Sequence, residues 1–310
     1  MNIIFAAASS FSEQTLLALA QLDHKIVAVL TQPDRRSGRG LKRTKNPIKT
    51  FAQNLDLPVL EYESLHDSGA YRTIKKLTPD LLLTMAYGQL VPNEILQIPK
   101  CDSINIHPSL LPRWRGASPI QSAILNGDKK TGVCLTRMVN ELDSGPIFVS
   151  HEINIASDET SNLLSNKLAE LSATLIENSL DQILDKKISP IEQVHENAIY
   201  APKIKKTDAM IIWSLSAIRL LRQIKAYNPW PVSYSLFKGK HFRIWDAELK
   251  KRDNGNHSPG KIVEIRDKDI LVSTGQQMLA LTHVQLEGKK KTTAAEFARG
   301  HNCQGLTLGC

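Results

Sequence analysis

The segment INIHPSLLPRWRGASP, Ile104–Pro119, tells more about the fold than any other stretch of the chain. Asn105 and His107 are two residues apart on an apolar run, so in a β-strand both side chains point to the same face. A turn rich in proline and glycine follows, and then an apolar helical pattern over 119–125. Open α/β sheets place their ligands at the carboxyl ends of strands that lead into helices. The segment therefore predicts an α/β fold with Asn105 and His107 at a ligand site.

A second polar turn, ELDSGP at 141–146, could bring the carboxylate of Asp143 to the same strand end. An amide and an imidazole can stabilise a developing oxyanion, and a carboxylate can orient the imidazole or take a proton. Acyl or formyl transfer is the chemistry that suits this set. As a lone pair on an apolar strand, however, Asn105 and His107 would more often be a turn cap and a hydrogen-bonded core histidine.

Apolar segments alternate with helical patterns through the first part of the chain. We expect strands at 2–8, 25–30, 80–85, 102–106 and 131–138, and helices at 13–22, 47–55 and 158–184. Ser12 is the expected N-cap of the first helix. This alternation predicts a doubly wound, mostly parallel, Rossmann-like α/β sheet. No Gly-x-Gly-x-x-Gly follows the first strand and no Walker loop occurs, so a nucleotide is not the expected ligand of this sheet.

The second part of the chain has a different pattern. Residues 188–206 lose periodicity and are interpreted as a linker between a catalytic domain, 1–187, and a C-terminal domain, 207–310. A helical pattern near 214–226 precedes five short alternating strands, expected at 232–237, 241–245, 260–265, 270–274 and 279–286. Five such strands favour a small β-barrel of the oligonucleotide-binding type.

Charge is unevenly distributed along the chain, whose net charge is +8 over 310 residues. Residues 1–202 carry 20 lysines and arginines against 22 aspartates and glutamates, a net charge of −2. Residues 203–310 carry 19 against 9, a net charge of +10. The second part is thus the one suited to a polyanion such as a nucleic acid, although a basic domain can also simply be soluble.

Several classes of protein are disfavoured by composition. The cysteines, Cys101, Cys134, Cys303 and Cys310, have no close pair and no histidine spacing, which argues against a zinc site and a disulfide framework. No apolar run reaches the length that crosses a bilayer, and the start of the chain reads as a buried strand rather than a signal peptide. We expect a cytoplasmic protein with no membrane partner.

The pattern Asn-x-His-x-Ser-Leu-Leu-Pro-x-x-Arg-Gly, followed by Asp-Ser-Gly, resembles the 10-formyltetrahydrofolate-dependent formyltransferases and their hydrolase relatives. The resemblance implies the formyltransferase fold and a catalytic set of Asn105, His107 and Asp143. It also implies 10-formyltetrahydrofolate as the formyl donor, with no metal. The residues implied in folate binding are Ser109, Leu110, Leu111, Pro112, Tyr87 and Gly88.

A basic loop after the second strand, TQPDRRSGRGLKRTK at 31–45, narrows the resemblance. It is similar to the Gln-Pro-Asp-Arg-x-x-Gly-Arg-Gly loop of the methionyl-tRNA formyltransferases, a branch of that family. Met85–Gly88 and Asn228–Pro231 match other signatures of this branch, and the similarity extends from residue 2 to about residue 299. The implied tRNA contacts are Arg35, Arg36, Arg39, Lys42, Arg43 and Lys45. Without the resemblance, a solvated surface loop would be the ordinary interpretation of this charge run.

The resemblance as a whole implies a monomer that moves the formyl group of 10-formyltetrahydrofolate to the α-amine of methionyl-initiator-tRNA. Two alternatives stay open: a formyltransferase for an amino sugar nucleotide, and a tRNA-binding protein without catalytic activity. The sequence departs from the family at Ala7–Ser9, where Gly-Thr-Pro is usual, at Ile212, where aspartate is usual, and in an unmatched tail, 300–310. None of these departures touches the catalytic set.

Overall fold

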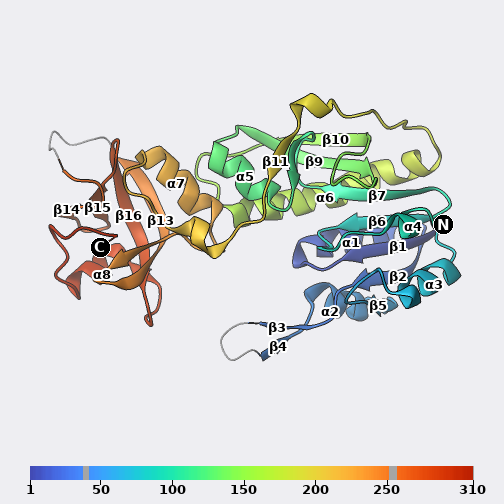
Figure 1. Cartoon of the computed structure of the whole chain (residues 1–310), viewed down its shortest axis with the longest axis horizontal. Coiled ribbons are helices and arrows are strands. Elements are labelled where there is room, and N and C mark those ends of the chain that lie inside the picture. Colours follow the sequence, from blue (N-terminus) through green and yellow to red (C-terminus); the bar gives the residue numbers. More distant parts are fainter. Residues whose placement is uncertain (38–41, 251–256, 310) are drawn as a thin grey trace. The chain divides into compact units, whose positions relative to one another are not determined.

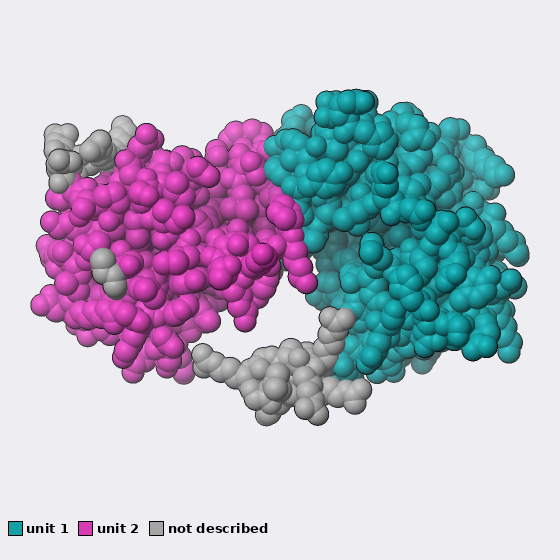
Figure 2. Space-filling model, in the orientation of Figure 1, with its two compact units in different colours: residues 1–119, 130–154, 165–201 teal, residues 120–129, 155–164, 202–310 magenta. Residues whose placement is uncertain are grey.

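The computed structural model of the protein describes residues 1–37, 42–250 and 257–309. The chain forms two compact units, drawn in teal and magenta in Figure 2. Unit 1 consists of 1–119, 130–154 and 165–201, and unit 2 of 120–129, 155–164 and 202–310. Unit 2 therefore takes up two short segments that lie within the first part of the sequence.

Unit 1 is built on a seven-stranded sheet in the order β10-β9-β7-β6-β1-β2-β5 (Figure 1). The five strands from β7 to β5 are parallel, whereas β9 and β10 run antiparallel at one edge. The strands are β1 Asn2–Ala7, β2 Lys25–Thr31, β5 Val59–Glu61, β6 Leu81–Met85, β7 Asp102–His107, β9 Lys130–Arg137 and β10 Ile147–Asn154. The sequence predicts this mostly parallel sheet, and the prediction is confirmed.

The central strands are apolar at nearly every position, so both faces of the sheet are apolar and helices cover them. Ile4 and Leu82 pack with Ile74 and Ile95, from α3 and α4, on one face. Residues of the opposite face, such as Phe5, are equally buried. The helices of unit 1 are α1 Glu13–Gln21, α2 Pro47–Asn54, α3 Ser68–Lys76, α4 Asn93–Leu96 and, from residue 165 on, α6 Ser161–Leu184. Helix α5, Pro119–Asn126, belongs to unit 2 from residue 120 on.

The prediction that Ser12 is the N-cap of α1 is confirmed for its position. Ser12 occupies the N-cap position, but its side chain makes no capping bond. Its hydroxyl donates instead to the Met85 carbonyl at the end of β6, 2.9 Å away. Ser9 provides the capping side chain one turn earlier, accepting from Phe11 N–H. Ala7, which stands where the family usually has glycine, ends strand β1 and is not among the residues with positive φ, so its backbone conformation does not require glycine.

Two short two-stranded ladders complete unit 1. Strands β3 Arg35–Ser37 and β4 Lys42–Thr44 pair antiparallel as the stem of the basic loop. Strands β8 Arg113–Gly116 and β11 Ile199–Ala201 pair in parallel. The second ladder connects the turn after β7 to the segment that the sequence presents as a linker.

Unit 2 contains an antiparallel sheet in the order β12-β13-β16-β15-β14, with β17 paired to β16. Among the described residues no pairing joins the edge strands β12 and β14, so the sheet is a half-barrel, which agrees with the small antiparallel barrel expected from the sequence. The elements are α7 Ala217–Ala226, β12 Tyr234–Phe237, β13 Lys240–Lys250, β14 Ile262–Ile265, β15 Ile270–Ser273, β16 Met278–Leu286, β17 Thr292–Thr293 and α8 Ala294–Arg299.

The core of unit 2 lies on one face of this sheet. Leu220 of α7 and Phe297 of α8 pack against Phe242 and Leu281 from the strands. The unmatched tail contributes Leu308, which is buried in the same cluster. Tail backbone groups bond to Gly260 and Ile262. The tail thus belongs to the core of unit 2. Through the described parts of the chain, no helix combines the length and apolarity needed to cross a membrane.

Candidate active site

The carboxyl end of β7 brings three predicted residues together. Asn105 Nδ2 donates to Asp143 Oδ1 over 3.3 Å. His107 Nδ1 lies 3.6 Å from the same oxygen. The side chains of His107 and Asp143 are 5% and 9% exposed, so these groups interact in a largely water-free setting. Amide, imidazole and carboxylate therefore meet at one atom, Asp143 Oδ1.

Backbone groups bond to one nitrogen of His107 and to one carboxylate oxygen of Asp143. His107 Nε2 lies 2.9 Å from the Trp114 carbonyl, and because a carbonyl only accepts, Nε2 must carry a hydrogen. Nδ1 is then the ring nitrogen that faces Asp143. The backbone N–H of Gly116 donates to Asp143 Oδ2 over 2.8 Å. One carboxylate oxygen is thus held by backbone, while the other faces the side chains of Asn105 and His107.

Gly116 has to be glycine for two reasons. Its φ is +112°, a conformation that side chains disfavour. A Cβ at this position would also lie 2.7 Å from the Ala201 carbonyl in the neighbouring strand β11. The close approach of β8 to β11 therefore depends on residue 116 and places its N–H at Asp143.

Sequence reasoning missed Thr84, which lies at the end of the neighbouring strand β6. Its hydroxyl donates to Asn105 Oδ1 over 2.8 Å. This bond holds the amide with its nitrogen toward Asp143. A polar residue at the carboxyl end of an otherwise apolar strand is the signal that could have identified it.

The residues predicted to bind folate divide into two groups. Ser109 and Leu111 are buried, and the Ser109 hydroxyl donates to the Arg113 carbonyl over 2.7 Å, so both side chains shape the loop itself. Leu110 and Pro112 are partly exposed. This loop can therefore offer Leu110 and Pro112 to a ligand.

Tyr87 and Gly88 follow β6 and differ in which of their atoms a folate could contact. The Tyr87 side chain packs in the apolar core of unit 1 with Ile4 and Ile95, and burial raises the pKa of its phenol. The Tyr87 carbonyl accepts from Gln32 Nε2 over 2.6 Å. Gly88 is exposed, with φ +74°. Any contact of Tyr87 with a folate is thus limited to its backbone.

The basic loop has a well-defined base at the ends of β2 and β4. Asn46 Nδ2 donates to Thr31 Oγ1 and to the Gln32 carbonyl, over 2.9 and 2.8 Å. The Asn46 N–H donates to Asp34 Oδ1, and Asn46 Oδ1 caps α2. Asn46 therefore ties the entry of the loop to its exit.

The predicted tRNA contacts are only partly within the described structure. Arg35 and Arg36 lie on β3 and Lys42 and Arg43 on β4, where the backbone alone is described. Arg39 lies outside the described residues. Lys45 is exposed. Lys49, counted with the loop's basic residues in the sequence, forms an ion pair with Glu61, at 2.9 Å.

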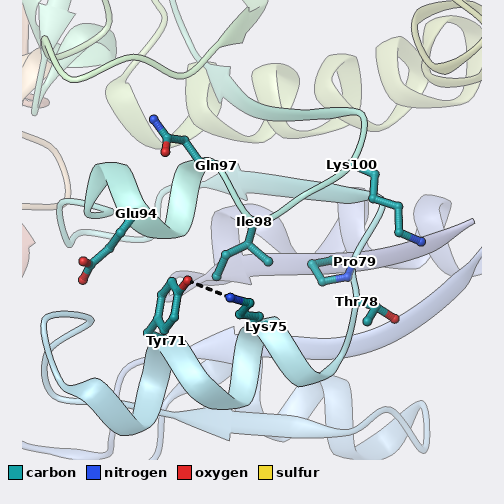
Figure 3. Close-up of a pocket in the computed structure, with 8 residues that line it drawn as sticks. All are labelled: Tyr71, Lys75, Thr78, Pro79, Glu94, Gln97, Ile98 and Lys100. Atoms are coloured by element: carbon teal, nitrogen blue, oxygen red, sulfur yellow. Dashed lines mark hydrogen bonds between the residues drawn. The ribbon is translucent and has the colours of Figure 1, made fainter.

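A groove of about 460 Å³ opens at the other end of β6, away from the catalytic cluster. It is lined by Tyr71, Lys75, Thr78, Pro79, Glu94, Gln97, Ile98 and Lys100 (Figure 3). Within it, Lys75 Nζ donates to the Tyr71 hydroxyl over 3.3 Å. No cluster of three metal-ligating side chains occurs among the residues that the structure describes.

The chain is similar to known proteins over nearly its whole length. Residues 1–180 match the formyl transferase family, and residues 203–302 match the formyl transferase C-terminal domain. The chain is 39% identical to a methionyl-tRNA formyltransferase from Buchnera aphidicola, covering 94% of this chain and 92% of that protein. It is 38% identical to one from Hydrogenovibrio crunogenus, covering 100% and 99%.

Solved structures share the fold at lower identity. A methionyl-tRNA formyltransferase from Clostridium thermocellum is 16% identical, with a TM-score of 0.56 over 88% of this chain and 99% of that one. An N-formyltransferase from Helicobacter canadensis, in complex with folinic acid and dTDP-3-aminofucose, is 17% identical, with a TM-score of 0.65 over 90% and 98%. With both parts of its sequence matched and nearly its full length aligned to relatives, the chain belongs to the formyl transferase family.

Proposed function

We propose that this protein transfers the formyl group of 10-formyltetrahydrofolate to the α-amine of methionyl-initiator-tRNA, in the cytoplasm. The main support for formyl transfer is that the Asn105 amide and the His107 imidazole both face one carboxylate oxygen, Asp143 Oδ1. The acceptor is suggested by relatives at 38 to 39% identity, whose names state methionyl-tRNA as their substrate.

The geometry suits attack of an uncharged amine on the formyl carbon. As the carbon–nitrogen bond forms, the formyl oxygen gains negative charge, which an N–H of the Asn105 amide can stabilise. A hydrogen on His107 Nδ1 would add a second donor, since Nε2–H is already bonded to the Trp114 carbonyl. The attacking amine must lose a proton, and Asp143 Oδ1 can accept it directly or through water. Breaking the bond from the formyl carbon to folate N10 then leaves N10 to take up a proton. Leu110, Pro112 and the backbone of Tyr87–Gly88 would contact the folate.

The tRNA requires more surface than the catalytic cluster provides. In this proposal Arg35, Arg36, Arg39, Lys42, Arg43 and Lys45 contact the acceptor arm. The basic residues beyond 202 would contact the phosphate backbone, since phosphate neutralisation by lysine and arginine supplies most of the affinity of such interfaces.

The decisive experiment measures transfer of labelled formyl from 10-formyltetrahydrofolate to three acceptors: methionyl-initiator-tRNA, methionyl-elongator-tRNA and a dTDP-linked amino sugar. We expect rapid transfer to the initiator tRNA alone. Preferred transfer to the sugar nucleotide would replace the proposed acceptor. Absence of transfer to all three would favour a binding protein without catalytic activity.

The role of Asp143 is tested by Asp143→Asn, which keeps the shape of the side chain and removes its charge. We expect kcat to fall by orders of magnitude while tRNA binding stays near normal, because the base is lost and the tRNA surface is untouched. Activity within a few-fold of the unsubstituted protein would remove Asp143 from the mechanism.

A further inference from the structure

The segment after α6 buries a polar side chain and exposes apolar ones. Gln193 is 5% exposed, whereas its neighbours Ile191 and Val194 are 75% and 56% exposed. Burying an amide costs free energy unless its hydrogen bonds are satisfied, so this inverted pattern points to a specific use of the Gln193 side chain.

All the bonds of Gln193 lead toward the catalytic cluster. Its Nε2 donates to the Asp143 carbonyl over 2.9 Å and to the Gly145 carbonyl over 2.7 Å. Its Oε1 accepts from Arg115 Nε and from an Arg115 terminal nitrogen, over 3.1 and 2.7 Å. The amide is fully used, with both donors on the Asp143 turn and its acceptor on Arg115.

Asp143 is the residue of this turn that most needs external support. Its φ is +51°, in the left-handed region that side chains other than glycine seldom occupy. Gly145 packs so closely that a Cβ there would lie 2.0 Å from the Arg137 carbonyl. The two Gln193 bonds bracket Ser144 and fix the carbonyls on either side of it.

Arg115 connects the other side of this network to the same cluster. It is 2% exposed, and in the described part of the chain its guanidinium lies within hydrogen-bond distance of Gln193 Oε1 and His195 Nδ1. Its neighbours in β8 contact the catalytic groups through their backbones: the Trp114 carbonyl accepts from His107, and the Gly116 N–H donates to Asp143. A buried cation bound to the amide oxygen also polarises the amide and strengthens its two N–H donors.

We propose that Gln193 and Arg115 are positioning residues that hold Asp143 in its reactive conformation. Gln193 acts on the backbone of the Asp143 turn, and Arg115 orients the Gln193 amide. The proposal rests on the catalytic role given to Asp143 above. It adds two residues from distant parts of the sequence, neither of which touches the reacting atoms.

The test compares Gln193→Glu, Gln193→Met and an exposed control, Glu196→Gln, in formyl transfer at saturating donor and tRNA. Gln193→Glu gives Arg115 an anionic partner, so the buried cation stays paired, but it removes both N–H donors from the Asp143 turn. We expect kcat to fall between about tenfold and about a hundredfold, as for loss of catalytic alignment, with little change in KM for either substrate. Gln193→Met should lose kcat similarly, and Glu196→Gln should match the unsubstituted protein.

The outcomes separate positioning from ordinary stability. If Gln193→Glu keeps the thermal midpoint and loses kcat, positioning is supported. A kcat within twofold of the unsubstituted protein in Gln193→Glu would overturn the proposal. So would a loss in both variants that follows the fraction of folded protein.

A double substitution distinguishes this proposal from the one on which it rests. If Gln193 acts through Asp143, then Gln193→Met should change the residual kcat of Asp143→Asn by less than twofold. A full additional loss in that background would show a separate role for Gln193 and overturn the positioning proposal. If Asp143→Asn alone keeps its activity, the catalytic role of Asp143 fails, whatever the Gln193 variants do.

Discussion

At the residue scale, the two oxygens of the Asp143 carboxylate have different surroundings. Oδ2 accepts from the Gly116 backbone, which cannot move without displacing β8. Oδ1 faces side chains, the Asn105 amide and the His107 imidazole. A carboxylate held at one oxygen and open to side chains at the other is suited to receive a proton at Oδ1. This asymmetry also makes the orientation of the Asn105 amide important.

Thr84→Val tests that orientation, because valine preserves the shape of the side chain and removes the hydroxyl that donates to Asn105 Oδ1. We expect kcat to fall about fivefold, which corresponds to about 1 kcal/mol for one lost hydrogen bond. Steady-state kinetics on methionyl-tRNA measures the change, and Thr84→Ser, which keeps the hydroxyl, should retain most of the activity. An unchanged kcat in Thr84→Val would mean that Asp143 alone orients the amide.

Asn105→Ala and His107→Ala address the oxyanion directly. Each should lose roughly 2 to 4 kcal/mol of transition-state stabilisation, and the double variant should lose less than the sum because both groups serve one charge. The four values of kcat/KM, from the unsubstituted protein, both single variants and the double variant, give the coupling energy. Losses that add would assign the two side chains to separate steps.

At the element scale, short strands outside the main sheet arrange the site. The apolar periodicity predicts β1, β2, β6, β7 and β9 within a few residues, because strands that are buried on both faces are apolar throughout. It does not predict β8 or β11, whose pairing joins a turn at 113–116 to an aperiodic segment at 199–201. Strand β10 was missed for a related reason: seven of its eight residues are exposed or partly exposed, so it shows no alternation of buried apolar and exposed polar residues.

The motif pattern identified Asn105, His107 and Asp143, but not the groups that hold them. The Trp114 carbonyl and the Gly116 N–H are backbone atoms, and no side-chain pattern encodes their positions. Gln193 lies in a segment without periodicity, so only the tertiary contacts connect it to the site. Local patterns predict strands and motifs, whereas long-range pairing decides how a site is supported.

Asn46, at the base of the basic loop, allows the role of the loop to be tested without changing a proposed catalytic residue. Asn46→Ala removes the cap of α2 and the bonds that join the two ends of the basic loop. We expect a loss of stability of about 1 kcal/mol, together with a raised KM for methionyl-tRNA and an unchanged rate of donor hydrolysis by water.

Asp67→Ala is the matched control, since Asp67 caps α3 in the same unit through its bond to Gly69 N–H. It should reduce the thermal midpoint comparably and leave the KM for tRNA unaltered. If both variants raise that KM equally, the effect of Asn46 is on general stability and not on the loop.

At the scale of the whole molecule, charge and catalysis belong to different parts of the sequence. The residues proposed for catalysis lie within 1–202, which carries −2, and the excess of positive charge lies beyond it. Such a division lets electrostatic attraction act on the tRNA while the reacting groups remain in a nearly neutral region. It also predicts that tRNA affinity, but not kcat at saturation, responds to salt.

Replacing the exposed lysines Lys289, Lys290 and Lys291 by glutamine tests the basic part of the chain. We expect the Kd for tRNA to rise and the dependence of log Kd on log salt to become shallower, because fewer counterions are released on binding. The control removes the same charge from three exposed lysines, Lys75 and Lys100, which line the groove of Figure 3, and Lys76, which follows Lys75 in the sequence. Equal effects in both triple variants would indicate that net charge alone governs affinity.

The pairing of β8 with β11 has a consequence for the synthesis of the protein. A ribosome that has translated as far as the end of α6, Leu184, has already made every side chain assigned to chemistry. The nascent chain still lacks Gln193 and the strand Ile199–Ala201, against which Gly116 packs. Catalytic competence should therefore arise only once residue 201 has emerged from the exit tunnel, so that an unfinished polypeptide cannot turn over substrate before its first unit is complete.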